Sequence, residues 1–271
     1  KGAVYTQQGE YSMAIEEYLN SLRIMEDLEN ETGKGKAFNN IGMVYYLQGN
    51  YPESKAYYKK ALEIFRKRGD QARISDILNN MGIIAYEEGE YQNSLDFHMS
   101  SLDTRKTVGN HRGEATSYTN IGDVYAATEA FEKALEYQKK ALEIQEELGD
   151  KKGMLSSMKG IGTVHSLTGN SEEALKYMED VLELSSEIGA KRELRDAYND
   201  ISNIYTDMGD YKSALEYKAS YSQMKDSVFS EQTVELASSI ETKFENEKKA
   251  KEIEILKKEN EIQVLELGRN R

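Results

Sequence analysis

The fold prediction starts from Asn39-Asn40-Ile41-Gly42-Met43-Val44-Tyr45, which is followed closely by Gly49-Asn50-Tyr51. A related stretch returns every 40 residues, so that the position of Gly42 is again glycine at 82, 122 and 162 and serine at 202. A fixed period of roughly 20–50 residues is typical of a solenoid, in which each repeat buries its apolar face against its neighbours. The sequence therefore predicts a repeat array and not two globular domains.

Composition agrees with thin helical layers and limits the chemistry. Of the 271 residues, 38% are hydrophobic and 31% charged, with one Pro and no Trp. The absence of Cys from the sequence excludes disulfides and thiolate chemistry and leaves the compartment open. Eight acidic and eight basic residues cancel in 241–271, so the net charge of −13 lies on residues 1–240. An acidic solenoid is a poor ligand for nucleic acid, because phosphate binding needs Lys and Arg.

Each repeat predicts two helices joined by tight turns. Gly49-Asn50 reads as a turn with Asn50 as the N-cap, and Pro52 falls in the first turn of the second helix, where its missing N–H costs little. The second helix carries an apolar face and ends at Gly69-Asp70, a helix-stopping glycine followed by the next N-cap. We expect antiparallel helices of roughly 15 residues each.

Glycine inside the first helix of each repeat predicts a close helix crossing. Each such glycine costs about 1 kcal/mol relative to Ala in an isolated helix. A small residue follows twelve positions later in each repeat, namely Ser54, Ser94, Ala134, Ala174 and Ala214. Contact between small residues lets the two helices of a hairpin approach closely, and a larger side chain there would overpack the crossing.

These residues resemble the tetratricopeptide repeat. The first helix has an apolar, a small and an aromatic residue (Ile41, Gly42, Tyr45), and the second has Ser54, Tyr58 and the pair Ala61-Leu62. The resemblance covers about 1–228 and implies an all-α, right-handed superhelix. The period is 40 and not 34, and charged residues such as Arg66 replace the usual late Pro, as in long repeats similar to those of peptide-capturing adaptors. HEAT and armadillo repeats lack this code of small and aromatic residues.

The repeat pattern ends near residue 228, where the sequence predicts one long helix over 231–267. Residues 229–244 carry an apolar stripe suited to cap the last hairpin, namely Val234, Ala237, Ile240 and Phe244. Residues 245–271 are rich in Glu and Lys, with a coiled-coil seam at Ile255, Ile262 and Leu265 that would pair in a homodimer. Ile253, Leu256, Asn260 and Leu267 form a second candidate seam, and a single solvated helix remains the alternative.

The resemblance also implies a ligand site on the concave face, which the first helices line. In peptide-capturing members, Asn in the position of Asn40, Asn80 and Asn120 bonds the ligand backbone or its terminal carboxylate. Asn39 and Asn79 precede it, and Met43, Tyr46, Ile83 and Tyr86 would be apolar neighbours. Lys36, Arg73 and Arg112 are candidates for a carboxylate clamp. The ladder breaks at Gly160 and Asp200, which favours a pocket in the N-terminal half; the alternative is that these Asn residues tie adjacent repeats together.

No catalytic, metal or cofactor site is expected. His98 and His165 occupy positions that hold Tyr58 and Tyr45 in an earlier repeat, so both read as core aromatics. We predict a non-enzymatic module that binds a protein or peptide. The layout is similar to the sensor region of membrane-anchored bacterial signalling proteins whose output is a histidine kinase, nucleotide cyclase or DNA-binding domain.

That layout carries expectations about the parent protein. The chain begins inside a repeat without an initiator Met, has no signal peptide and no run of 18 apolar residues, and reads as an excised fragment. The resemblance implies a membrane anchor after Arg271 and favours the periplasmic or extracytoplasmic side. The alternative is a free-standing cytoplasmic adaptor with no output domain.

Overall fold

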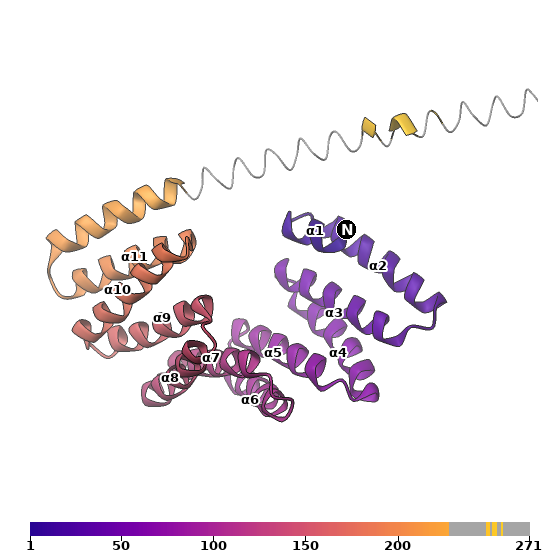
Figure 1. Ribbon diagram of the computed structural model, residues 1–271, viewed down its shortest axis with the longest axis horizontal. Coiled ribbons are helices and arrows are strands. Elements are labelled where there is room, and N and C mark those ends of the chain that lie inside the picture. Colours follow the sequence, from indigo (N-terminus) through magenta and orange to yellow (C-terminus); the bar gives the residue numbers. More distant parts are fainter. Residues whose placement is uncertain (228–247, 250, 254–255, 257–271) are drawn as a thin grey trace, which may run out of the picture. The chain divides into compact units, whose positions relative to one another are not determined.

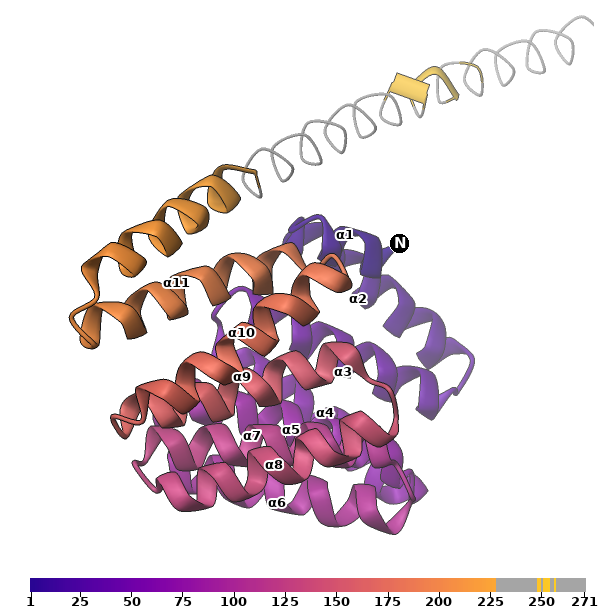
Figure 2. The ribbon, with the colours of Figure 1, turned by 60° about the vertical axis from the view of Figure 1, so that its left-hand side comes forward.

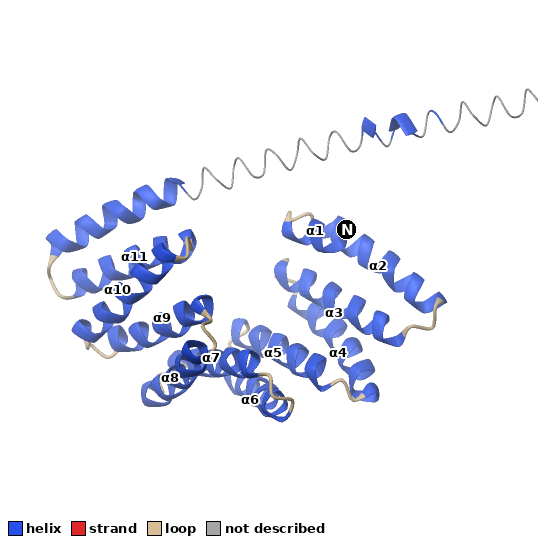
Figure 3. Ribbon diagram, in the orientation of Figure 1, coloured by secondary structure: helices blue, strands red, loops and turns tan. Residues whose placement is uncertain are grey.

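A computed structural model describes residues 1–227, 248–249, 251–253 and 256, and the chain divides into two units, Lys1–Met224 and Lys225–Arg271. The described part is helical and contains no strand (Figure 3). The helices are α1 (Gly2–Gln7), α2 (Tyr11–Asp27), α3 (Glu31–Leu47), α4 (Tyr51–Arg68), α5 (Gln71–Glu87), α6 (Tyr91–Thr107), α7 (His111–Ala127), α8 (Phe131–Glu147), α9 (Lys151–Leu167), α10 (Ser171–Glu187) and α11 (Lys191–Asp207). Residues 211–227 are also helical.

The first unit is built from helix pairs in chain order, which confirms the predicted all-α solenoid. Each helix contacts the one before it, and the most extensive contacts are within the hairpins α3/α4, α5/α6 and α7/α8. Figures 1 and 2 show each helix running back alongside its predecessor. The first helices of successive repeats also contact one another, α5 with α7 and α7 with α9, so these helices form the inner layer. Most helices have 17 residues, slightly more than expected.

The turns follow from glycines and polar caps. Gly69 ends α4 in the left-handed conformation at φ 69°. The side chains of five residues that precede described helices accept a hydrogen bond from the backbone N–H three positions on, namely Asn30, Asp70, Asn110, Asp150 and Asp210. Asn50 stands at the predicted N-cap of α4, but its side chain makes no capping bond. Side-chain capping therefore occurs at the start of the inner helices α3, α5, α7 and α9 and of the helix at 211–227, while α11 lacks it and α4 begins with Pro52 in its first turn.

The glycine crossings are close, as predicted. Ser54 Oγ donates to the carbonyl oxygen of Gly42 at 2.6 Å, and Ser94 Oγ to that of Gly82 at 2.8 Å. A Cβ on Gly42 would lie 2.9 Å from the ring of Tyr58, because the glycine also makes room for the side chain sixteen positions later. That residue, here called the crossing residue, is Tyr18, Tyr58, His98, Gln138 or Met178 in successive repeats.

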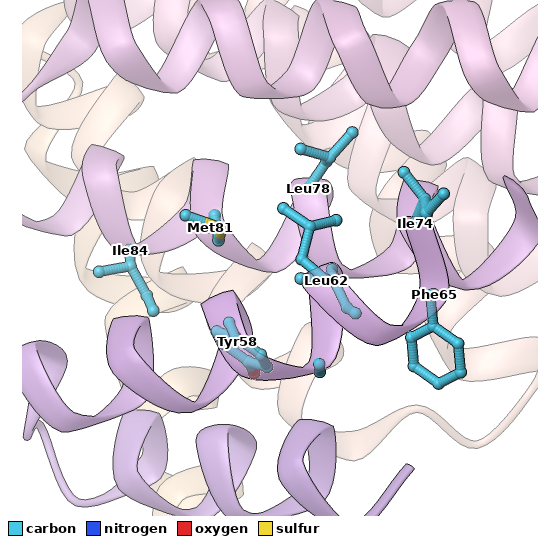
Figure 4. Packing of buried hydrophobic residues seen from close by; sticks show 9 residues of the cluster. Tyr58, Leu62, Phe65, Ile74, Leu78, Met81 and Ile84 are labelled. Carbon is cyan, nitrogen blue, oxygen red and sulfur yellow. The ribbon is translucent and has the colours of Figure 1, made fainter. Parts of the chain in front are cut away.

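The core lies between consecutive helices of neighbouring repeats. In the largest cluster, Tyr58, Leu62 and Phe65 of α4 face Ile74, Leu78, Met81 and Ile84 of α5 (Figure 4). Tyr58 and Phe65 are each 1% exposed. Their burial joins the second helix of one repeat to the first helix of the next.

The predictions for the C-terminal segment fall largely outside the described residues. These include the cap at Val234, Ala237, Ile240 and Phe244, the seam at Ile255, Ile262 and Leu265, and the divisions 229–244 and 245–271. The described residues 248–249, 251–253 and 256 are helical. The cap, the seam and the boundary at 228 therefore stay predictions. None of the described helices is long and apolar enough to cross a membrane.

Candidate functional site

A groove of about 630 Å³ runs across the inner layer of three consecutive repeats, and we call it the central groove. Its walls come from α5, α7 and α9, with His98 reaching it from α6. Apolar lining is supplied by Ile83, Tyr86, Ala126 and Leu167. Asn120, Asp123 and Lys159 supply polar groups. The groove therefore combines apolar surface with a few directed polar atoms, which is the usual make-up of a ligand site.

Asn79 and Asn120 are joined to each other across two repeats. Asn120 Nδ2 donates to Asn79 Oδ1 at 2.8 Å, and Arg105 Nη1 approaches the same oxygen at 3.4 Å. Asn79 is only 6% exposed, so its amide ties repeats together. Asn120 is half-buried and lines the groove.

Asn80 interacts with a neighbouring repeat and not with either groove. Its side chain hydrogen-bonds the hydroxyl of Tyr58 in the preceding hairpin. Burial raises the pKa of Tyr58 to about 12, while the bonds from Asn80 and Ser54 act in the opposite direction. Asn80 lines neither the central groove nor the smaller groove described next. Its position fits the alternative that the sequence left open, a tie between repeats.

Asn39 and Asn40 line a second hollow of about 330 Å³ between α3 and α5, here called the N-terminal groove. Two of the predicted clamp residues, Lys36 and Arg73, line it with them. The third, Arg112, lies apart and pairs with Asp150 at 3.2 Å. The predicted ladder is thus not continuous: Asn40 lines the N-terminal groove, Asn120 lines the central groove, and Asn80 lines neither.

Only some of the predicted apolar neighbours line a groove. Tyr86 lines the central groove and its ring meets that of Tyr91 edge-on at 5.7 Å. Tyr46 stacks on Tyr51 at 6.1 Å, and it lines neither groove. Met43 is half-buried and likewise lines neither. Burial is the main cause that raises the pKa of both phenols, Tyr46 and Tyr86.

Three polar residues of the central groove region were not predicted as site residues. Gln138, 1% exposed, donates through Nε2 to Asp123 Oδ1 at 2.7 Å and to the carbonyl oxygen of Thr119 at 3.2 Å. Asp123 is open to solvent, yet it lies among the inner helices, and this partial burial raises its pKa to about 6. Asp123 stands in the repeat position of Met43, and Gln138 and His98 stand in that of Tyr58. The replacement of apolar or aromatic residues by polar ones at these fixed repeat positions was the sequence signal that could have identified them as site residues.

Of the charged side chains in the central groove, Lys159 has an ion-pair partner, whereas Asp123 and Glu87 have none among the described residues. Lys159 Nζ pairs with Asp200 at 3.4 Å, so its charge is partly neutralised. Asp123 and Glu87 form no ion pair with any described residue. Burial is the largest cause of the raised pKa of the Tyr86 phenol, and the charges of Asp123 and Glu87 also raise it. Both carboxylates therefore lie near that side chain. The groove thus carries two carboxylates without a cationic partner in the described part of the chain.

Comparison with known proteins agrees with the repeat architecture. A sequence model described as tetratricopeptide repeat matches residues 1–67, 73–147 and 153–226. No curated protein matches the chain.

Several solved structures share the fold at low sequence identity. BtubC (BKLC) from P. vanneervenii superposes with a TM-score of 0.68 at 16% identity, covering 82% of this chain and 91% of that one. PH0952 from Pyrococcus horikoshii, a Signal Transduction ATPase with Numerous Domains protein with a tetratricopeptide repeat sensor, gives 0.69 at 19% identity, covering 87% of this chain and 37% of that one. A Rap protein complexed with Competence and Sporulation Factor gives 0.59 at 16% identity, covering 84% and 74%.

The match of the sequence model spans most of residues 1–226, and the helix pairs have the arrangement of a right-handed α-solenoid. The chain belongs to the tetratricopeptide repeat family.

Proposed function

We propose that this protein-interaction repeat domain is the sensor region of a bacterial signal-transduction protein and binds an extended peptide or protein segment in the central groove. The observation that carries the proposal is the groove itself, about 630 Å³ across α5, α7 and α9. An extended segment needs backbone partners and apolar hollows. Asn120 supplies amide groups for the first need, and Ile83, Tyr86 and Leu167 supply apolar surface for the second.

The comparisons support the same direction at the level of fold. One structural relative is described as carrying a tetratricopeptide repeat sensor, and another is complexed with a factor named for competence and sporulation. We extend the sensor role to this chain because its central groove is formed by consecutive repeats and is open to solvent. Asn40 and Asn39 in the N-terminal groove, with Lys36 and Arg73, would contact a further part of the same segment.

The test is a selection from a displayed library of random peptides on the whole chain, with a groove-filling variant. Thr163 is exposed and lines the central groove, so Thr163→Trp should block the groove without disturbing the core. Thr107→Trp, on the exposed side of α6, is the matched control. We expect peptides enriched on the wild-type chain to bind Thr107→Trp equally and to lose binding to Thr163→Trp. Equal binding to both variants would refute the groove assignment.

Alanine at Asn40, Asn80 and Asn120 is a second, less clean test. Binding should weaken, but Asn80 also bonds Tyr58 and Asn120 bonds Asn79, so stability should fall too. Helicity by circular dichroism must therefore accompany the binding measurement. For the sensor role, the enriched peptide should change the output of the full-length parent, and Thr163→Trp should abolish that response; a response that persists argues for an adaptor.

A further inference from the structure

We propose that the central groove selects its ligand through a lysine or arginine side chain, which Asp123 and Glu87 bind. The inference rests on the proposed function, because it names the ligand class of the same groove. It goes beyond the amide ladder, which recognises a backbone and does not distinguish side chains.

The Asp123 carboxylate has acceptor capacity left over. Its Oδ1 takes one hydrogen bond, from Gln138 Nε2 at 2.7 Å, whereas a carboxylate offers about four acceptor positions. No described cation pairs with it, and its raised pKa reports a charge only partly compensated by its surroundings. Glu87, near the same Tyr86 phenol, adds a second negative charge. A ligand cation would offset the incomplete solvation of Asp123.

The buried His98 side chain of α6 contributes to the lining of the same groove. His98 lines it, although the residue is only 1% exposed, and its Nδ1 has no hydrogen-bond partner among the described residues. Burial, with the nearby Arg105 charge, lowers the pKa of His98 to about 4, so the ring is neutral near pH 7. A neutral imidazole offers one acceptor nitrogen. Lys and Arg side chains carry donors only, so they complement the carboxylates of Asp123 and Glu87, and the neutral His98 ring adds no positive charge beside them.

Polar crossing residues occur where the central groove lies. The crossing residue is Tyr18 and Tyr58 in the first two hairpins and Met178 in the fourth full repeat. It is His98 and Gln138 in two of the three repeats whose inner helices, α5, α7 and α9, form the groove; the α9 repeat has Met178. Since the glycine crossing also accommodates Tyr and Met, packing alone does not require a polar residue there. The polar pair therefore points to the groove and its ligand.

Charge argues against an acidic ligand in this groove. The chain carries −13, and the lining lysine, Lys159, already pairs with Asp200. Lys36 and Arg73 lie in the N-terminal groove instead. Bringing a ligand carboxylate beside Asp123 and Glu87 would add like-charge repulsion. A basic side chain is the chemistry that the central groove matches.

The test uses the whole chain and the displayed peptide library. Asp123→Asn removes the charge with little change of shape, and Asp103→Asn, exposed on α6, is the matched control for loss of one negative charge. We expect the wild-type chain and Asp103→Asn to enrich peptides with a fixed Lys or Arg, and Asp123→Asn to bind peptides without that preference. The enriched peptide and its Lys→Met or Arg→Met analogue are then compared by fluorescence anisotropy. The analogue should bind the wild-type chain about 10- to 100-fold more weakly, and this difference should vanish on Asp123→Asn.

Other outcomes separate the two proposals. If Asp123→Asn and Glu87→Gln both keep the same basic preference, or if the enriched peptides are acidic or uncharged, the cation inference is overturned while peptide binding stands. If Thr163→Trp binds the enriched peptides as well as the wild-type chain, both proposals fail. If the preference survives in Asp123→Asn and disappears in Glu87→Gln, the assignment to Asp123 is overturned.

Discussion

The hairpins α3/α4 and α7/α8 have the same crossing geometry and different interiors. In the first, Tyr58 and Phe65 are each 1% exposed and belong to the large apolar cluster of Figure 4. In the second, the same repeat positions hold Gln138 and Gln145, which are 1% and 4% exposed. A Cβ on Gly42 would meet Tyr58 at 2.9 Å, and one on Gly122 would meet Gln138 at 2.8 Å.

The difference separates what sets the shape of a repeat from what sets its chemistry. The glycine fixes the approach of the two helices in both hairpins, so the crossing residue can change character without changing the architecture. Gln138 and Gln145 each leave a buried Oε1 without a hydrogen-bond partner in the described residues. A buried unpaired polar atom costs about 1–3 kcal/mol, so the α7/α8 hairpin should contribute less stability than α3/α4.

The largest expected effect is at Tyr58. Tyr58→Ala would empty the centre of the α4/α5 cluster and remove the hydroxyl that Asn80 bonds. Replacing a large buried aromatic by alanine typically costs about 3–5 kcal/mol. Chemical unfolding should show a loss of this order in the free energy of unfolding.

Gln138→Met is the matched change in the other hairpin. It keeps the side-chain length, copies the residue found at Met178, and removes the unpartnered oxygen. The substitution also removes the hydrogen bonds from Nε2 to Asp123 and to the carbonyl oxygen of Thr119. Because this loss offsets the gain from removing the unpartnered oxygen, stability should shift by less than about 1.5 kcal/mol. A loss as large as that of Tyr58→Ala would show that the buried amide stabilises its hairpin as much as the aromatic ring does, which contradicts the comparison.

The next prediction tests the glycine crossing, which the two hairpins share. Gly122→Leu should destabilise by about 1–3 kcal/mol, because any Cβ there meets Gln138 and must displace it. Thr116→Leu on the exposed side of the same helix should change stability by less than about 0.5 kcal/mol. A thermal melt of Gly122→Leu that matches the wild type would break the argument that glycine sets the crossing.

The sequence was sufficient for the architecture because its strongest signals are periodic. Glycine and small residues at fixed spacing report a close helix approach, and Gly69 with Asp70 reports a helix end and the next N-cap. These are local rules, and the structure follows them. The Asn50 side chain departs from the expected cap, since cap geometry depends on where the preceding turn directs the side chain.

The site was less accessible to sequence reasoning. The ladder pattern suggested the N-terminal half, whereas the larger groove lies across α5, α7 and α9. Groove volume depends on side-chain size at inner positions, and the ladder does not reveal that Gly160 makes room for the Gln138 amide, which a Cβ there would meet at 2.5 Å. Bonds such as that of Asn79 with Asn120 join residues 41 positions apart, and no single repeat shows them.

A third effect is the pH dependence of the α5–α8 region. Asp123 has a folded-state pKa near 6, above its ordinary value of 3.8, so its contribution to stability is present below pH 4 and lost as the pH rises through 6. His98 has a folded-state pKa near 4, below its ordinary 6.5, so its contribution is present above pH 6.5 and lost as the pH falls through 4. The two slopes oppose each other between pH 4 and 6.

Single variants should expose these opposed slopes in melting temperatures measured from pH 4 to 7. Asp123→Asn should make stability rise more steeply with pH, because the His98 term remains. His98→Gln should make stability fall with pH over the same range. Tyr58→Phe is the control, because the phenol of Tyr58 has a pKa of about 12 and does not titrate between pH 4 and 7. This variant should leave the slope of melting temperature against pH unchanged. Parallel curves for all three variants would contradict the assigned pKa directions.

The smallest effect concerns the inter-helix turns of the two hairpins. Gly49 adopts φ 73° between α3 and α4, and Glu129 adopts φ 57° between α7 and α8. The left-handed conformation costs a residue with a Cβ about 1 kcal/mol, and glycine avoids that strain at some loss of backbone entropy on folding. Glu129→Gly should therefore raise the free energy of unfolding by about 0.5 kcal/mol, and Gly49→Glu should lower it by a similar amount. The matched control is Glu143→Gly inside α8, which should destabilise because glycine is a poor helix former. If Glu129→Gly destabilises like Glu143→Gly, the turn of the α7/α8 hairpin does not carry the strain that its backbone angle indicates.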